Sequence, residues 1–260
     1  MQVEETRPVP RTPTFRLDGR KALISGAGRG IGFACAAALA EAGASVTLIS
    51  RSAGEIEAAA EALRSQGRDA RATVLDVTDT AAVRKFIDEG ERHDILVNNA
   101  GTNRPGPFLE ATEENFDVIM SLNVRAAYFM TQAFARRLTA EAGTGSIINI
   151  SSQMGLVGAA NRTLYCASKH AMEGFTKAMA VELAPMGVRV NTLCPTFIET
   201  EMTRPYFENT AFRDEVLSKI KLGRVGQIED LMGAVVFLAS DASAMVTGAP
   251  LVVDGGWTAE

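Results

Sequence analysis

Short apolar runs recur along the chain and are separated by longer amphipathic stretches. The runs are continuous and rich in β-branched residues, which is typical of parallel strands that are covered on both faces. Strands that alternate with helices indicate right-handed crossovers. We therefore predict an α/β fold, a doubly wound seven-stranded parallel sheet with helices on both faces. The predicted strands are 21–25, 45–50, 71–75, 94–98, 146–151, 188–194 and 250–254, and the predicted helices include 54–65, 80–91, 112–140, 164–185 and 229–239.

The chain shows no internal repeat and no low-complexity linker. Residues 15–260 are therefore predicted to form a single domain, whose dinucleotide-binding and catalytic character rests on the motifs described below. Residues 1–14 contain three prolines and are predicted to be an N-terminal extension. The polar and aromatic segment at about 196–222 is predicted to be a lid over the substrate.

A glycine-rich turn joins the first predicted strand to an alanine-rich helix. Gly26, Gly30 and Gly32 are spaced as Gly-x3-Gly-x-Gly, which differs from the general GxGxxG form. Glycines let the backbone approach a pyrophosphate, whose charge then lies at the helix N-terminus. The turn, with Arg29 and Ile31 inside it, therefore predicts a dinucleotide site and makes the fold Rossmann-type.

A tyrosine and a lysine stand four residues apart, as Tyr165-x3-Lys169, with Ser152 thirteen residues upstream. On a helix this spacing places both side chains on one face. The ammonium group is expected to lower the phenol pKa toward the working range, so that Tyr165 acts as a general acid and base. The pattern alone also fits a surface pair, and Ser151 rivals Ser152.

The motifs together resemble those of the classical short-chain dehydrogenase/reductase family over residues 17–257. The resemblance includes members of the gluconate 5-dehydrogenase and 3-oxoacyl-carrier-protein reductase kinds. Thr196 departs from it, because the family most often has glycine after this proline. The shared motifs are Ser25-Gly-x3-Gly-x-Gly, Asn98-Asn99-Ala100-Gly101, Asn123 in Leu-Asn-Val, Ser152, Tyr165-x3-Lys169 and Asn191-Thr-Leu-Cys-Pro195.

The resemblance implies hydride transfer between a nicotinamide cofactor and a secondary alcohol or ketone, and it assigns roles to single residues. Ser152, Tyr165, Lys169 and Asn123 would be catalytic, with Asn123 holding a proton-relay water. The implied cofactor-binding set is Gly26, Arg29, Gly30, Ile31, Gly32, Ser50, Arg51, Asp76, Val77, Asn99, Ala100, Gly101, Tyr165, Lys169, Pro195, Ile198 and Thr200.

The end of the second predicted strand bears on cofactor choice. An NAD-preferring site places a carboxylate there for the ribose 2′-hydroxyl, whereas this chain has Ser50 followed by Arg51. The guanidinium groups of Arg51 and Arg29 suit a 2′-phosphate. The sequence therefore favours NADP(H) and leaves use of NAD(H) open.

The substrate is expected to be a small polar molecule. Gln153 and Asn161 near the Tyr165 motif, with Arg104 after the Asn99 turn, predict a polar pocket rim that suits a polyol, sugar or sugar acid. Arg104 is the candidate for pairing with a substrate carboxylate. Two alternatives stay open: a 3-oxoacyl-carrier-protein reductase, and a catalytically idle NADP-binding regulator.

Composition narrows the range of partners. The formal net charge of −5 argues against nucleic acid and anionic membranes, which favour basic patches. The three cysteines have neither metal-ligand nor disulfide spacing, and no signal peptide is evident, so we expect a cytoplasmic protein without a metal. Apolar residues on more than one face of the helices in 112–140 and 164–185 predict a homotetramer.

Overall fold

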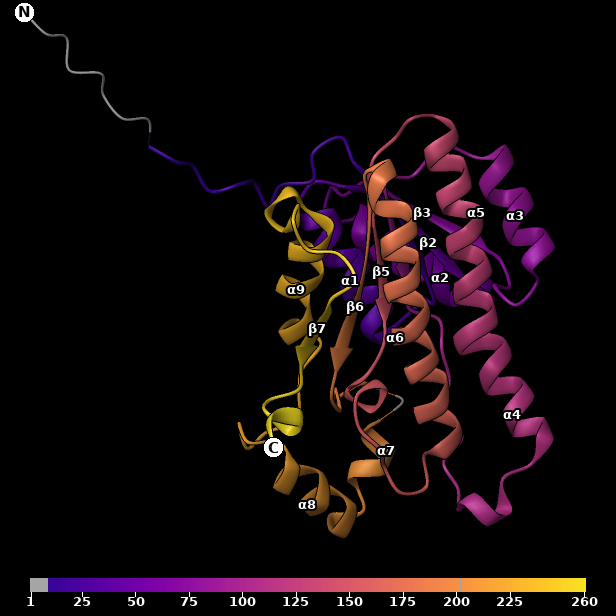
Figure 1. The fold of residues 1–260 in the computed structure, drawn as a ribbon, viewed down its shortest axis with the longest axis vertical. Coiled ribbons are helices and arrows are strands. Elements are labelled where there is room, and N and C mark those ends of the chain that lie inside the picture. Colours follow the sequence, from indigo (N-terminus) through magenta and orange to yellow (C-terminus); the bar gives the residue numbers. More distant parts are fainter. Residues whose placement is uncertain (1–8, 202) are drawn as a thin grey trace, which may run out of the picture.

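Seven parallel strands form one sheet in the computed structural model, which describes residues 9–201 and 203–260 (Figure 1). The strand order is β3-β2-β1-β4-β5-β6-β7, so the order reverses between β1 and β4. This confirms the predicted fold class. The strands are β1 Lys21–Ser25, β2 Ser45–Ser50, β3 Ala70–Val74, β4 Ile95–Asn98, β5 Gly145–Ile150, β6 Val188–Pro195 and β7 Pro250–Val253.

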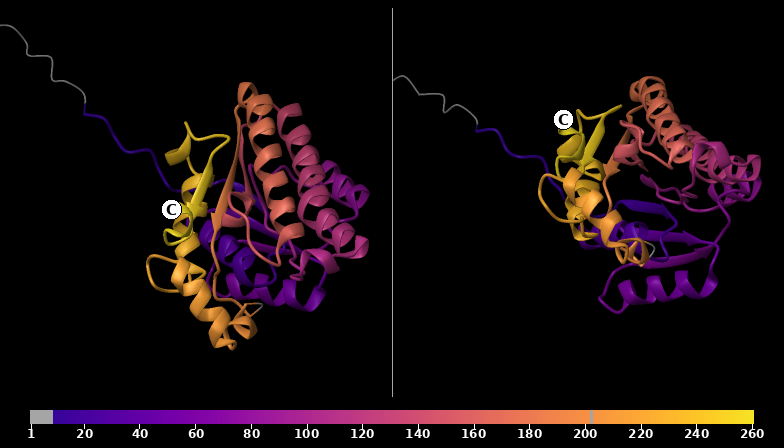
Figure 2. Two further views of the ribbon diagram at one scale, coloured as in Figure 1. Left: turned by 60° about the horizontal axis from the view of Figure 1, so that its bottom comes forward. Right: turned by 90° about the horizontal axis from the view of Figure 1, so that it is seen from below.

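Helices cover both faces of the sheet (Figure 2). One core, built around Leu39, Ile56 and Val235, packs α1, α2 and α9 against the sheet, and the other, around Ile87 and Phe134, does the same for α3 and α5. Two hydrophobic layers of this kind fix the sheet between them. The helices are α1 Gly30–Glu41, α2 Ala53–Arg64, α3 Thr80–Glu89, α4 Glu113–Met120, α5 Ala127–Ala140, α6 Thr163–Leu183, α7 Arg204–Phe207, α8 Thr210–Lys219 and α9 Glu229–Ala239.

One predicted helix is wrong. Residues 112–140 form α4, a π-helical turn over Ser121–Ala126, and α5, instead of a single regular helix. Asn123 lies in the π turn and is fully buried, and its amide binds neighbouring chain segments. Single π turns are frequent at functional sites.

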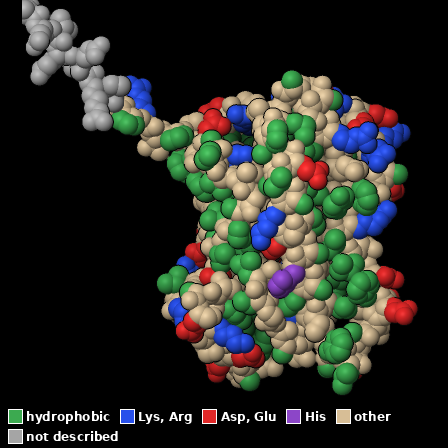
Figure 3. Space-filling model, in the orientation of Figure 1, with side chains coloured by type: hydrophobic (Ala, Val, Ile, Leu, Met, Phe, Trp, Pro, Cys, Tyr) green, Lys and Arg blue, Asp and Glu red, His purple; other side chains and the backbone are tan. Residues whose placement is uncertain are grey.

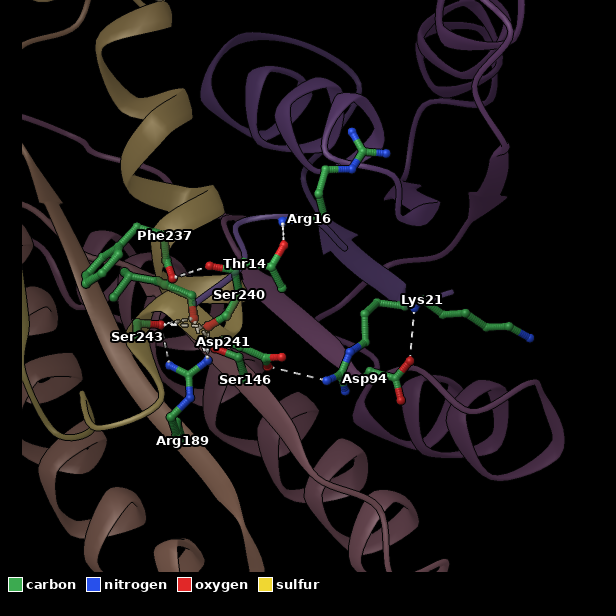
Figure 4. Close-up of polar contacts among 12 residues, drawn as sticks. Thr14, Arg16, Lys21, Asp94, Ser146, Arg189, Phe237, Ser240, Asp241 and Ser243 are labelled. Carbon is green, nitrogen blue, oxygen red and sulfur yellow. Dashed lines mark hydrogen bonds and ion pairs between the residues drawn. The ribbon is translucent and has the colours of Figure 1, made fainter. Parts of the chain in front are cut away.

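The amino-terminal end of the sheet is held by partly buried polar contacts (Figure 4). The guanidinium of Arg189 on β6 donates to Ser243 Oγ at 2.8 Å and to the Leu238 carbonyl at 2.9 Å. The Lys21 backbone N–H donates to Asp94 Oδ2 at 3.0 Å. These contacts join β6 to the end of α9 and β1 to β4. The carboxyl-terminal ends of the strands have no such contacts among those named here and can carry a site.

The predicted extension is described only in part, because residues 1–8 lie outside the described residues. Residues 9–14 are exposed and have no regular secondary structure. The predicted lid segment, described except for residue 202, contains α7 and α8. Phe197 anchors it, with ring centroids 5.6 Å from Phe212 and 5.8 Å from Trp257.

Candidate active site

A cavity of about 320 Å³ opens at the carboxyl ends of the central strands. Its walls come from Gly26 after β1, Asn99 after β4, Ser151 after β5 and Thr196 after β6. This edge, next to the reversal of strand order, is where doubly wound sheets bind their ligands.

The glycine turn has the shape that a dinucleotide requires. A Cβ atom on Gly32 would lie 2.3 Å from the Gly26 carbonyl oxygen, so only glycine allows this close packing of helix on turn. Gly30 begins α1 at φ +56°, in the left-handed region. The helix has no side-chain cap and no acidic residue in its first turn. Its N–H groups are therefore available to an anionic group, and the turn fits a pyrophosphate.

Ser25, Asn99 and Ala100 hold the turn against the end of β4. The Ser25 hydroxyl accepts hydrogen bonds from the backbone N–H groups of Asn99 and Ala100, at 3.1 and 3.2 Å. The Asn99 side-chain amide donates to the Gly26 carbonyl at 2.9 Å. The Asn98–Gly101 motif thus braces the glycine turn and lines the cavity with Asn99, Ala100 and Gly101.

Tyr165 and Lys169 both line the cavity, from one face of α6. The Lys169 ammonium lies 5.6 Å from the Tyr165 ring centroid and donates to the Ile150 carbonyl at 2.7 Å. Ser152, also in the lining, donates to Gln153 Oε1 at 2.7 Å and accepts from the Met154 N–H at 3.1 Å. The structure therefore brings together the three side chains that the sequence singled out.

The acid–base properties differ from the expectation. Burial raises the pKa of Tyr165 to about 12, against a partial lowering by Ser152. Burial also lowers the pKa of Lys169 to about 8, and the carboxylate of Glu173 one helical turn away opposes this shift. The phenol is thus a proton donor at neutral pH. Burial dominates its pKa, and the groups that lower this pKa are Ser152 and Arg162, not the expected Lys169.

Asn123 connects the π turn to the site. Its amide donates to the Thr102 carbonyl at 2.9 Å and to Ser168 Oγ at 3.0 Å, and its Oδ1 accepts from the Thr102 N–H at 2.8 Å. Ser168 lies on α6 between Tyr165 and Lys169. Asn123 thereby fixes both α6 and the loop after β4, although it does not itself line the cavity.

Other candidates for cofactor binding lie around this cavity or beyond its rim. Arg29, Gly30, Ile31, Pro195, Ile198 and Thr200 line it. Ser50, Arg51, Asp76 and Val77 lie outside the lining, toward the ends of β2 and β3. Arg51 is exposed, with its Nη1 3.8 Å from Asp76 Oδ2, and Asp76 also accepts from the Thr78 hydroxyl at 2.7 Å.

Of the residues predicted to bind the substrate, the structure places only some at the cavity. Gln153 lines the cavity, whereas Asn161 and Arg104 do not. Arg104 turns toward α4 and donates to Asn115 Oδ1 at 2.8 Å. Arg162, which the sequence analysis missed, lines the cavity instead. Its position directly before the helix that carries Tyr165 is the signal that could have found it.

A Rossmann-type sheet with this glycine turn and this Ser152, Tyr165 and Lys169 cluster defines a nicotinamide-dependent oxidoreductase. A family model described as Enoyl-(Acyl carrier protein) reductase matches residues 26–258. The chain belongs to the classical short-chain dehydrogenase/reductase family and is an NAD(P)-dependent enzyme that acts on CH–OH groups.

Named relatives match almost the whole chain. Gluconate 5-dehydrogenase of Gluconobacter oxydans is 40% identical over 94% of this chain and 96% of its own. L-xylulose reductase of Bos taurus is 38% identical over 94% and 99%. A crystal structure of a gluconate 5-dehydrogenase from Burkholderia cenocepacia, in complex with NADP and tartrate, superposes with a TM-score of 0.91 at 40% identity and covers 95% and 98% of the two chains.

Proposed function

We propose that the enzyme transfers a hydride between NADP(H) and a secondary alcohol or ketone of a polyol, sugar or sugar acid. The observation that carries this proposal is the shared cavity, in which the glycine turn and the Ser152, Tyr165 and Lys169 cluster face one space. Gln153, Asn103 and Arg162 in its lining offer polar groups to a hydroxylated substrate. The relatives named for gluconate and xylulose support the same substrate class.

The residues divide the work between binding and proton transfer. When bound, the nicotinamide supplies hydride chemistry at its C4 atom. In the reductive direction, the Tyr165 phenol donates its proton to the developing alkoxide, and Ser152 donates a hydrogen bond to the same oxygen. Lys169 holds positive charge beside the phenolate that forms, while Asn123 fixes the helix that carries both residues. In the oxidative direction, Tyr165 accepts the proton.

The proposed cofactor contacts follow the path from the glycine turn outward. The turn would hold the pyrophosphate, Asn99–Gly101 the adenine ribose, Asp76 and Val77 the adenine, and Pro195, Ile198 and Thr200 the nicotinamide. The guanidinium groups of Arg29 and Arg51 would bind the 2′-phosphate, with Ser50 as a hydroxyl donor. Both arginines are exposed, and the carboxylate partners that they have among residues 9–201 and 203–260 lie at 3.5 Å or more.

Replacement of Arg51 tests the preference for NADP(H). Arg51→Ala should weaken NADPH binding by about 1.5–3 kcal/mol, the range for a hydrogen bond to a charged group. NADH, which lacks the 2′-phosphate, should bind as before. Fluorescence titration with both cofactors measures the effect, and Arg84→Ala, at an exposed position on α3, is the matched control. Equal losses for both cofactors would contradict the assignment.

Each of the two alternatives meets an objection from the chain itself. A 3-oxoacyl-carrier-protein reductase would need a basic surface for its acidic partner, and this chain carries a net charge of −5. An idle regulator would not need Ser152, Tyr165 and Lys169 together in one cavity. Turnover of alditols, aldonates and 3-oxoacyl thioesters with NADP(H) and with NAD(H) decides among them, because the proposal fails if only the thioester is reduced or if nothing reacts.

The buried, free thiols of Cys35, Cys166 and Cys194 favour the proposed cytoplasmic location, where thiols stay reduced. Among the described residues, no helix is long and apolar enough to cross a membrane.

A further inference from the structure

Arg162 places a positive charge at the substrate end of the cavity. It immediately precedes α6 and lines the same space as Ser152 and Tyr165. Its side chain is half-buried, and its charge reaches the phenol, whose pKa it lowers against the larger effect of burial. The guanidinium therefore shares one cavity with the two side chains that the reacting carbon must contact.

No carboxylate of the described residues lies within 4.0 Å of Arg162. The only hydrogen bond from its guanidinium to the described part of the chain is a long one, from Nη1 to the Asn161 carbonyl at 3.4 Å. Glu215 on α8 attracts it from farther away, but that carboxylate accepts from the Lys219 ammonium at 3.0 Å. Arg104, by contrast, is bound to Asn115, outside the cavity.

Such a guanidinium is in an unfavourable position unless an anion joins it. Burial lowers the pKa of Arg162 from its ordinary value, which shows that the charged form is partly desolvated there. A partly buried charge without a partner is costly in free energy, and a planar guanidinium pairs best with a carboxylate in bidentate geometry. The missing partner is thus expected to come from the substrate.

Neutral polar groups that line the same cavity as Arg162 indicate which other groups the substrate carries. Asn103 Oδ1 and Thr196 Oγ1 line the cavity or its wall and are buried without a hydrogen-bond partner among the described residues. Gln153 and Tyr206 add an amide and a phenol to the lining. The other charged groups of the lining are engaged elsewhere, because Lys169 donates to the Ile150 carbonyl and Arg29 lies 3.8 Å from the Glu201 carboxylate. Arg162 amid these uncharged hydrogen-bonding groups matches a molecule with one carboxylate and several hydroxyls.

We propose that Arg162 binds the carboxylate of a polyhydroxy acid, so that the enzyme acts on aldonic acids in preference to neutral polyols. This inference rests on the proposed function and specifies its substrate class. The carboxylate would pair with the guanidinium, while a secondary carbinol of the same molecule lies against Ser152 and Tyr165. The unpartnered Asn103 and Thr196 groups would bind its remaining hydroxyls.

Calorimetry of the enzyme–NADPH complex tests the proposal without turnover, because the reduced cofactor cannot oxidise an alcohol. The ligands are gluconate, galactonate and xylonate, each compared with its alditol, namely glucitol, galactitol and xylitol. At least one aldonate should bind about tenfold or more tightly than its alditol. Arg162→Met should weaken the binding of that aldonate by about 10- to 100-fold, the range for a charge-assisted hydrogen bond. The affinity for the alditol should stay within about twofold of the wild-type value.

Two further variants sharpen the test. Arg162→Lys keeps the charge without the planar fork and should restore part of the affinity for the aldonate. Arg213→Met, at an exposed arginine on α8 outside the cavity, is the matched control and should bind both ligands as the wild type does.

Three results would overturn the inference: alditols that bind as well as aldonates, equal losses of both in Arg162→Met, or a loss that appears in Arg104→Met instead. Equal losses of affinity for aldonate and alditol would indicate that Arg162 acts on the lid, through its attraction to Glu215 on α8, and not on the substrate carboxylate. Turnover of the same ligands with NADP separates the two proposals. Oxidation of alditols as readily as aldonates would support the proposed function and contradict the Arg162 assignment. An enzyme that binds aldonates through Arg162 but oxidises none of them would support the Arg162 assignment and contradict the proposed function.

Discussion

At the scale of single residues, the proton of Tyr165 decides how the reaction depends on pH. With a pKa raised to about 12, the phenol is protonated at neutral pH and suited to ketone reduction. Alcohol oxidation needs a proton acceptor, so its rate should rise as the pH increases toward that value. Tyr165→Phe should reduce turnover in both directions by about 10²–10⁴-fold or more. Steady-state rates from pH 6 to 10 check both statements, and a Phe variant with near-wild-type turnover would refute the mechanism.

The buried ammonium of Lys169 lowers the stability of the fold, although the proposed mechanism needs it beside Tyr165. Its folded pKa of about 8 lies below the ordinary 10.5, so below pH 8 folding buries a cation at a cost of about 3 kcal/mol. Between these two values the unfolded chain binds more protons, and stability rises with pH. Lys169→Met removes the buried charge but leaves the Ile150 carbonyl without its donor, which costs about 1–3 kcal/mol.

The Lys169→Met variant should therefore unfold at pH 7 at a temperature equal to or above that of the wild type, and this advantage should shrink toward pH 10. Its cofactor affinity should fall and the pH profile of its residual turnover should change, because the ammonium is lost. Thermal melts without cofactor at the two pH values, together with cofactor titration, measure these effects. A variant that melts several degrees lower at pH 7 would contradict the desolvation argument.

At the scale of elements, the sequence predicted each strand to within one residue at either end. Buried parallel strands form continuous apolar runs, and the glycines and polar residues that end them are visible without a structure. The helix over 112–140 was mispredicted because a π turn leaves no mark in periodicity. The sequence favours Arg104 over Arg162 because the direction of a loop side chain depends on tertiary packing, here on Asn115 of α4, which binds Arg104.

The π turn yields its own prediction. Asn123 makes three hydrogen bonds while fully buried, and Asn123→Ala would leave the Thr102 backbone groups and Ser168 without this partner. We expect a loss of about 2–4 kcal/mol in the free energy of unfolding, together with lower turnover, because α6 carries Tyr165. Urea denaturation measures the loss. Gln132→Ala, at an exposed position on α5, is the control, and equal stabilities of the two variants would refute the bracing role.

At the scale of the whole molecule, the amino-terminal end of the sheet stabilises the fold and the carboxyl-terminal end forms the site. The amino-terminal end is locked by Arg189 and the Lys21–Asp94 contact, whereas the carboxyl end carries loops around a cavity. Rigid strands thus hold Ser152, Thr196 and the glycine turn in place. The remaining wall comes from the segment around Tyr206, which is free to vary in sequence without loss of the fold.

The outer surface predicts assembly. Apolar side chains gather over α4, α5 and α6 (Figure 3), among them Tyr128 and Val181, which is 77% exposed. β7 forms one edge of the sheet, where Val252 is also exposed. Two isologous contacts, one through the helices and one through β7, would generate a dihedral tetramer. Burial of exposed apolar side chains supplies the driving force for such contacts.

Light scattering at micromolar concentration should therefore give a mass near four times the 27.7 kDa of one chain. Val181→Asp should break the helix contact and Val252→Asp the edge contact, because each would place an unpaired carboxylate in an apolar interface. Each variant should form dimers, and the double variant should be monomeric, with circular dichroism reporting an unchanged fold. A wild-type mass near 27.7 kDa would contradict both contacts, and a wild-type dimer that only Val181→Asp dissociates would leave the helix contact alone.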